Sequence, residues 1–161
     1  MGAGVAGHGA AQEAERKLAA ATVAFVQPGE MQPEIDFNFQ GEEAVVARVL
    51  ERVARRGAKW FSFDLPVDES HPMALIVTYG DDERQRRTFE ILVDGVRVGA
   101  QAITIERRIP ERDPRLFDVE YKLPPDAVRG KTKVTVRLQA AAGEEIAAVC
   151  GLRMIRVDAE R

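Results

Sequence analysis

The chain has 161 residues, of which 45% are hydrophobic and 30% charged, and its formal net charge is −3 at pH 7. This composition is typical of one soluble globular domain with its own core and excludes a disordered chain. The small net charge argues against nucleic acid and anionic membranes as partners, because both select clustered Lys and Arg. A single cysteine, Cys150, excludes an internal disulfide and a multi-cysteine metal site. We interpret it as a small buried hydrophobe.

The N-terminal segment offers little to bury. Residues 1–9 are rich in Gly and Ala, and Ala10–Ala21 combines strong helix formers with a thin apolar stripe. We therefore expect residues 1–21 to be a flexible leader or a short helix, followed by a first edge strand at Thr22–Gln27. No signal peptide is visible and no apolar run is long enough to span a membrane. As it stands the chain is expected to be soluble and cytoplasmic, but its compartment stays open because a fragment would lack its leader.

An extended loop and a helix are expected next. Prolines and a Pro-Gly pair punctuate Gln27–Phe39, which predicts an extended loop held against the body by Phe37 and Phe39. In Glu42–Arg56 apolar residues recur at helical spacing, with acidic residues in the first turn and basic residues in the last. This pattern predicts a helix of about four turns, ended by Gly57. Its apolar stripe would cover either the sandwich or a partner subunit.

Alternation with a period of two begins at Trp60–Leu65. There Phe61, Phe63 and Leu65 fall on one side of the chain, opposite a polar side that carries Trp60 and Asp64, so a strand with one buried face is predicted. The same pattern recurs in four further segments: Met73–Tyr79, Thr88–Asp94, Phe117–Leu123 and Lys133–Gln139. A partner strand is expected from Val96 towards Ile105.

The remaining signals are turns and a final strand. Asp94-Gly95 predicts a two-residue type I′ hairpin, and Gly99 suggests a break in the strand that follows it. Ile146–Val157 is the last expected strand, with a bulge at Gly151. Seven or eight short strands without alternating helices predict an all-β antiparallel sandwich, most simply a jelly roll, over residues 22–157. Residues 158–161 should be a loose tail.

Several motifs, in this order along the chain, resemble a known family. They are Q-P-G-E-M-Q-P-E at Gln27–Glu34, D-F-N-F-Q-G-E at Asp36–Glu42, W-F-S-F-D-L-P-V-D at Trp60–Asp68, R-T-F-E-I-L-V-D-G at Arg87–Gly95, F-D-V-E-Y-K-L-P at Phe117–Pro124 and K-V-T-V-R-L-Q-A at Lys133–Ala140. From about residue 22 to 157 the chain resembles the C-terminal accessory domain of bacterial β-L-arabinofuranosidase-type glycoside hydrolases (family 127/146-like), formerly a domain of unknown function.

The resemblance implies a domain without catalysis. In those proteins the catalytic unit resembles an (α/α)6 barrel with a zinc-bound cysteine nucleophile, and both lie upstream of the region matched here. The resemblance therefore implies a non-catalytic β-sandwich, similar to carbohydrate-binding modules, attached to a sugar-cleaving enzyme. Two departures matter: Phe37 stands where the family usually has His, and the helical run Glu42–Arg56 replaces a Gly/Arg/Trp-containing loop.

Three residues are candidates for binding a sugar. Trp60 is the best platform, since it shares the polar side of its strand with Ser62 and Asp64. Tyr79, which borders a loop, is the second candidate, and Asp64 is the third. The competing interpretation is that both aromatics fill gaps between the layers.

The acidic residues and histidines carry weaker signals. Asp64, Asp68 and Glu69 are too close in sequence to face each other across a glycosidic bond, so we interpret them as solvated acids and expect no catalytic residue. Asp81, Asp82 and Glu83 could hold a structural calcium ion but lack the spacing of a dedicated site. His8 and His71 are isolated, and no other metal site or cofactor is expected.

Two functions remain open at this point. The first is a non-catalytic, carbohydrate-binding-like accessory domain, with a plant-type or bacterial glycan and an upstream catalytic domain as partners. The alternative is a structural or oligomerisation module without a small-molecule ligand, which would self-associate through residues 42–56. An independent hydrolase has very little support in the sequence.

Overall fold

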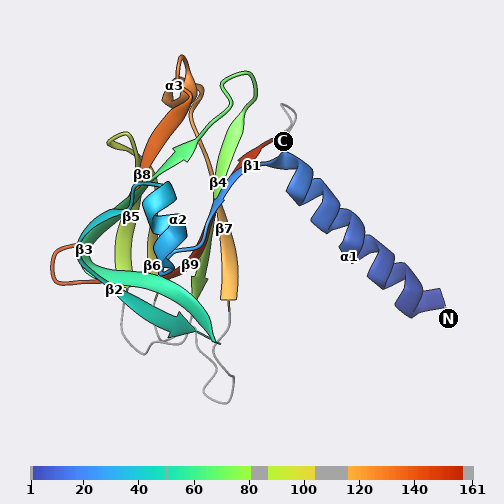
Figure 1. The fold of residues 1–161 in the computed structure, drawn as a ribbon, viewed down its shortest axis with the longest axis horizontal. Coiled ribbons are helices and arrows are strands. Elements are labelled where there is room, and N and C mark those ends of the chain that lie inside the picture. Colours follow the sequence, from blue (N-terminus) through green and yellow to red (C-terminus); the bar gives the residue numbers. More distant parts are fainter. Residues whose placement is uncertain (1, 50, 81–86, 104–115, 158–161) are drawn as a thin grey trace.

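The computed structural model describes residues 2–49, 51–80, 87–103 and 116–157, and its strands form one antiparallel sheet that folds back into two layers (Figure 1). This confirms the all-β sandwich. The helices are α1 (Gly2–Ala21), α2 (Met31–Asp36) and α3 (Pro125–Val128). The strands are β1 (Thr22–Val26), β2 (Gln40–Val49), β3 (Arg52–Pro66), β4 (Met73–Gly80), β5 (Arg87–Val93), β6 (Val96–Ile103), β7 (Leu116–Lys122), β8 (Lys133–Ala140) and β9 (Ile146–Arg156).

The long strand β3 joins the two layers. The strand order is β6-β5-β8-β3-β9-β4-β7, with β1 paired to β9 and β2 paired to β3. The C-terminal half of β3, Trp60–Pro66, pairs with β8, whereas Arg55 and Gly57 in its N-terminal half pair with β9. One continuous strand therefore contributes to both layers, and the space between them becomes the core.

The core is built from the side chains that alternation predicts to point inward. Phe61, Phe63 and Leu65 of β3 are fully buried, and so are the alternate residues of β4, β5, β8 and β9. Phe61 and Phe63 meet edge to face with ring centroids 6.3 Å apart, and Phe39 packs on Phe63 at 5.2 Å. Each such buried side chain stabilises the fold by about 1.5–3 kcal/mol. The expected role of Phe37 and Phe39 in holding their segment to the body is confirmed.

The predicted helix over Glu42–Arg56 is wrong. These residues form the β2–β3 hairpin, in which Ala47 pairs with Ala54 and Val45 with Arg56. The apolar residues that suggested a helical stripe instead serve the two faces of a hairpin, where Val49 and Ala54 are buried in a small second cluster with Ala148 and Cys150. Tertiary pairing thus overrides the helix-forming tendency of the Glu, Ala and Arg residues.

Gly57 is a close-contact residue within β3 and does not end a helix. It lies opposite Ala44 where the β2–β3 register shifts, and Glu43 on the facing strand has a φ of 53°. A Cβ atom on Gly57 would lie 2.8 Å from the Glu43 carbonyl oxygen. The bulge brings the two backbones together at this point, so only glycine fits without movement of a main chain.

The N-terminal segment and one loop are more helical than expected. The helix α1 runs from Gly2 to Ala21 and extends away from the sandwich (Figure 1). Within Gln27–Phe39 the structure has the short helix α2 instead of a wholly extended loop. The edge strand at Thr22–Val26 is confirmed, paired to β9. Among the described residues, no helix has the length and hydropathy needed to cross a membrane.

The predicted turns agree with the backbone. Asp94 and Gly95 have φ values of 48° and 85°, which confirms the tight hairpin between β5 and β6. The β4–β9 register shifts between Gly151 and Val149, so the bulge expected at Gly151 is present. Cys150, which lies at this shift, is buried as expected. The acidic loop containing Asp81, Asp82 and Glu83 and the tail at residues 158–161 lie outside the described residues.

The close approach at Gly57 makes a stability prediction. We expect Gly57→Ala to lower the free energy of unfolding by roughly 1–3 kcal/mol, because the new methyl group meets backbone atoms on β2 that cannot rotate away. The matched control is Gly9→Ala, where nothing lies within 4 Å of the new Cβ. Urea unfolding monitored by circular dichroism measures both. Equal stability of the two variants would contradict the close contact between β2 and β3.

Candidate functional site

The outward face of β3 carries a row of polar and aromatic side chains, as the sequence predicted. Trp60 and Asp64, which are partly exposed, and Ser62 between them, which is buried, alternate with the core residues Phe61, Phe63 and Leu65. On neighbouring strands, Gln139, Arg137 and Thr135 of β8 and Glu42 and Gln40 of β2 occupy the facing register positions. We call Trp60, Ser62 and Asp64, with these neighbours, the β3 row.

Trp60 is half-buried and held from two sides. The guanidinium carbon of Arg137 lies 4.1 Å from the indole ring centroid, a cation–π contact. The indole also hydrogen-bonds to Glu42, whose pKa is lowered chiefly by the hydrogen bond from Lys59 at 3.0 Å. Arg137 occupies one face of the ring. Trp60 keeps part of its surface exposed beside this contact.

Asp64 positions its neighbours at the other end of the β3 row. One of its carboxylate oxygens accepts a hydrogen bond from Thr135 at 2.7 Å, and the other accepts one from Asn38 at 2.9 Å. Gln40 in turn donates to the Asn38 side-chain oxygen at 3.1 Å. Asp64 thus orders an amide and a hydroxyl at the surface, and its own oxygens are already engaged.

The other acidic candidates lie in turns. Asp68 is bound by Arg156, Ser70 and His71, and the hydrogen bond from Arg156 is the largest of the effects that hold its pKa well below the usual range. Glu69 accepts a hydrogen bond from the Gly130 backbone at 2.9 Å. These contacts close turns at one end of the sandwich. No group of three or more His, Cys, Asp or Glu residues within the described part of the chain could hold a metal ion.

Tyr79 is not a surface platform, and this expectation needs correction. Its side chain is fully buried, and its hydroxyl group hydrogen-bonds to that of Tyr121 at 2.6 Å. Its ring packs against Phe89 and Phe117 at 5.5 and 5.7 Å, and burial raises the pKa of the hydroxyl. The signal was present in the sequence, because Tyr79 shares the inward face with Met73, Leu75 and Val77. That periodicity outweighs its position beside a loop.

A hollow of about 370 Å³ lies beside the β3 row, between β5 and β8. Gln139 links the two, since it lies opposite Trp60 on one side and opposite Glu90 on the other. Glu90 and Arg97, 3.9 Å apart, also line this β5–β8 hollow. The arrangement places an aromatic ring, an amide, a carboxylate and a guanidinium along one surface, at a volume within the range of small-molecule sites.

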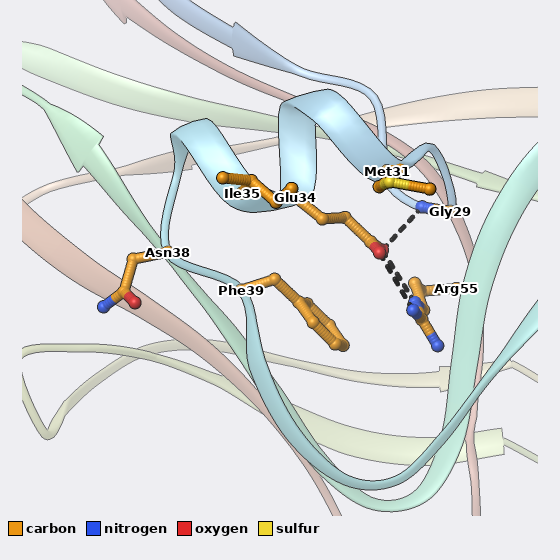
Figure 2. A pocket seen from close by; sticks show the side chains of 7 residues that line it. All are labelled: Gly29, Met31, Glu34, Ile35, Asn38, Phe39 and Arg55. Carbon is orange, nitrogen blue, oxygen red and sulfur yellow. Dashed lines mark hydrogen bonds and ion pairs between the residues drawn. The ribbon is translucent and has the colours of Figure 1, made fainter.

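A second hollow of about 580 Å³ lies beneath α2, and Figure 2 shows its lining. Met31 and Ile35 of α2 stand at this α2 hollow with 78% and 64% of their surface exposed. Phe39 and the Glu34–Arg55 pair line it further inside, and Asn38 connects it to Asp64 of the β3 row. Sequence reasoning missed this hollow because it placed Arg55 on a helix and α2 in a loop.

The Glu34–Arg55 ion pair fastens α2 to β3. The guanidinium donates to both carboxylate oxygens at 2.7 and 2.9 Å, and the Gly29 backbone N–H donates a third hydrogen bond at 2.8 Å. Arg55 also donates to the Ala44 carbonyl oxygen and lies 4.4 Å from the Phe39 ring centroid. Burial acts to raise the pKa of Glu34, but the hydrogen bonds and charge of Arg55 and the bond from Gly29 together bring it below its ordinary value.

This lowered pKa predicts a pH dependence of stability. The pair stabilises the fold fully above about pH 5, and the stabilisation is lost as the pH falls through 4.5 towards the folded-state pKa, where the carboxylate becomes protonated. We expect Glu34→Gln to lower the free energy of unfolding by roughly 1–2 kcal/mol at pH 7 and by progressively less below pH 4.5. Urea unfolding across this pH range tests it, with the exposed Glu13→Gln as control. A difference between wild type and Glu34→Gln that is constant with pH would contradict this role.

Comparison with solved structures places the fold among known β-sandwiches. A family 35 carbohydrate-binding module from Clostridium thermocellum is 13% identical with a TM-score of 0.54, covering 83% of this chain and 98% of that module. The CBM36-1 domain of a multidomain xylanase from the hindgut metagenome of Trinervitermes trinervoides is 9% identical with a TM-score of 0.53, covering 83% and 97%. The ANX1 ectodomain from Arabidopsis thaliana is 12% identical with a TM-score of 0.62, covering 83% of this chain and 41% of that one.

These identities are low, so the comparisons establish a shared jelly-roll fold and nothing finer. No curated protein matches the chain in sequence. A family model, described as a family of unknown function (DUF6805), matches residues 17–155. The match spans β1 to β9, so it includes the β3 row and both hollows. The chain therefore belongs to the DUF6805 family.

Proposed function

We propose that this domain binds carbohydrate, without catalysing a reaction, at the β3 row and the adjoining β5–β8 hollow. The observation that carries the proposal is the partly exposed Trp60, held by Arg137 and Glu42 beside a polar hollow. An aromatic ring on the surface of a rigid sheet offers the flat apolar contact that a sugar ring needs. The backbone under this ring is paired on both sides, so the site is formed before the ligand arrives.

The polar groups around Trp60 suit sugar hydroxyl groups. Gln139 offers both a donor and an acceptor next to the indole, and Glu90 and Arg97 add an acceptor and donors across the hollow. At the far end, Asp64 holds Asn38 and Thr135 in fixed orientations. Several directed hydrogen bonds along one stacking surface are the usual means of recognising a saccharide.

The class of glycan that we propose rests on the resemblance of the sequence motifs. They resemble the accessory domain of β-L-arabinofuranosidase-type glycosidases, so we propose arabinose-containing glycans, of plant or bacterial origin, as the first ligands to test. The domain would hold the glycan near an accompanying catalytic domain. Solved domains of similar fold include carbohydrate-binding modules of families 35 and 36, which supports a binding role for the sandwich.

Trp60 is the only tryptophan, so its fluorescence reports on this site alone. We expect arabino-oligosaccharides to change the emission saturably at millimolar concentration. Gln139→Ala keeps the fluorophore and should weaken binding by about two- to tenfold, the effect of one lost hydrogen bond. Gln32→Ala, on the exposed side of α2, is the matched control and should bind like wild type. An emission spectrum that stays unchanged at millimolar sugar would contradict the proposal.

A second function, self-association, is favoured by one observation. The strand β2 lies at an edge of the described sheet, paired only to β3, and its Val45 and Val46 are 52% and 54% exposed. Edge strands with exposed apolar side chains can pair with a second chain. Residues 42–56 would then associate as a hairpin and not as a helix.

Sedimentation velocity separates this function from the first. If β2 mediates self-association, the wild type should form dimers as its concentration rises. Val46→Lys should remain monomeric, because a lysine on the edge strand opposes its pairing with a second chain. Val96→Lys is the control, since Val96 is similarly exposed, at 57%, on the hairpin between β5 and β6. A wild type that stays monomeric at all concentrations would remove this function.

A further inference from the structure

A third hollow, of about 400 Å³, lies on the outer surface of the opposite layer, over β1, β9 and β4. Its place follows from the register of the strands. Phe25 of β1 lies opposite Arg153 of β9, and the next row across the sheet joins Gly151, Thr78 and Asp118. Arg52 enters from the start of β3. We call this the arginine hollow.

The glycine at position 151 shapes the hollow. With no side chain there, the ring of Phe25 leans over the β9 backbone, and a Cβ atom on Gly151 would lie 3.0 Å from that ring. The ring is 38% exposed, and the guanidinium carbon of Arg153 lies 4.7 Å from its centroid. An accessible aromatic surface and a stacked cation therefore stand side by side.

The two arginines of the hollow bond only to neutral acceptors within the described residues. Arg153 donates one hydrogen bond, to the hydroxyl of Thr22 at 2.9 Å, and Arg52 donates one, to the carbonyl oxygen of Cys150 at 3.1 Å. Each guanidinium has five N–H groups, so most of its donors are uncommitted. This contrasts with Arg55, whose charge is matched by the carboxylate of Glu34.

The charges of the described residues that line the hollow are unbalanced. Asp118 is its one acidic lining residue among those described, and that carboxylate accepts a hydrogen bond from Thr78 at 2.5 Å. Among the lining residues that the structure describes, two half-buried cations against one exposed anion leave an excess of one positive charge in a partly desolvated space. Such a place attracts an anion more strongly than an exposed arginine does, because water screens it less.

We propose that the arginine hollow is a binding site for a carboxylate carried on a compact organic ligand. Two guanidinium groups can each present a fork of parallel N–H donors that matches a carboxylate, while Phe25 contacts the carbon skeleton. The volume accommodates a group of monosaccharide size. The carboxylate can come from a free small acid or from an acidic sugar, and the two sources share this chemistry. The site lies on the layer opposite Trp60 and does not depend on the proposed function.

The test compares glucuronate with glucose, which differ in the carboxylate, by thermal unfolding and amide chemical shifts at low ionic strength. Glucuronate should raise the melting temperature of the wild type and shift amides of β1, β4 and β9, whereas glucose should leave them unchanged. Acetate is the third probe. A response to acetate equal to that to glucuronate identifies free small acids as the ligands, and a response to glucuronate alone identifies acidic sugars.

Substitutions that remove a positive or a negative charge from the arginine hollow should change carboxylate binding in opposite directions. Arg52→Gln and Arg153→Gln should each weaken glucuronate binding by about tenfold or more. Both variants are measured because Arg153 also contacts Phe25, so that only Arg52→Gln removes a guanidinium without disturbing the aromatic ring. Asp118→Asn removes the competing negative charge, keeps an acceptor for Thr78 and should tighten binding about two- to fivefold. Arg129→Gln, an exposed arginine beside α3 and outside both proposed sites, should change nothing.

Three results would overturn the site: no response of the wild type to glucuronate or acetate, a response that survives both arginine substitutions, or weaker binding by Asp118→Asn. None of them bears on Trp60, because the fluorescence titration with neutral arabino-oligosaccharides reports on the opposite layer. Failure of that titration would likewise leave the glucuronate result unchanged. The two proposals therefore stand or fall separately.

Discussion

The structure depends on the alternation of side chains along β3 as this strand crosses from one layer to the other. Its inward residues, Phe61, Phe63 and Leu65, form the centre of the core, and they must stay inward because a slip of one residue would expose them all. The same constraint fixes Trp60 and Asp64 on the outside. The surface that we propose for ligand binding is thus the reverse side of the core strand. The packing of the core makes this surface rigid.

Three guanidinium–aromatic contacts mark the three surfaces of interest, and they differ in how the positive charge is matched. Arg55 over Phe39 is neutralised by Glu34, which makes that contact a structural fastening of α2. Arg137 over Trp60 belongs to a mixed polar row, suited to neutral hydroxyl groups. Arg153 over Phe25 bonds only to a neutral hydroxyl among the described residues, and it shares its hollow with a second arginine. The local charge balance therefore separates a structural role from the two kinds of binding that we propose.

The sequence predicted the sandwich well, because a strand with one buried face shows apolar and polar residues in alternation along the chain. It failed at Glu42–Arg56, where valines spaced for a helix also fit a twisted hairpin, and only the pairing of β2 with β3 and of β3 with β9 decides between them. The prediction that Trp60 lies on the outward face is correct. The prediction for Tyr79 is wrong, because its position beside a loop suggests exposure whereas its place in the alternation of Met73–Tyr79 puts it on the inward face. The hollows could not be predicted, since each joins residues from strands distant in sequence, as Phe25, Thr78 and Arg153 show.

The central claim is that the outward face of β3 binds a sugar while the opposite face of the same strand remains closed core. The most direct measurement is the mapping of amide and indole chemical shifts during titration with an arabino-oligosaccharide. The account predicts shifts at the Trp60 indole and along β3, β8 and β5, with the inward methyl groups of the core unchanged. Saturable shifts confined to other elements, with the Trp60 indole unmoved, would contradict it.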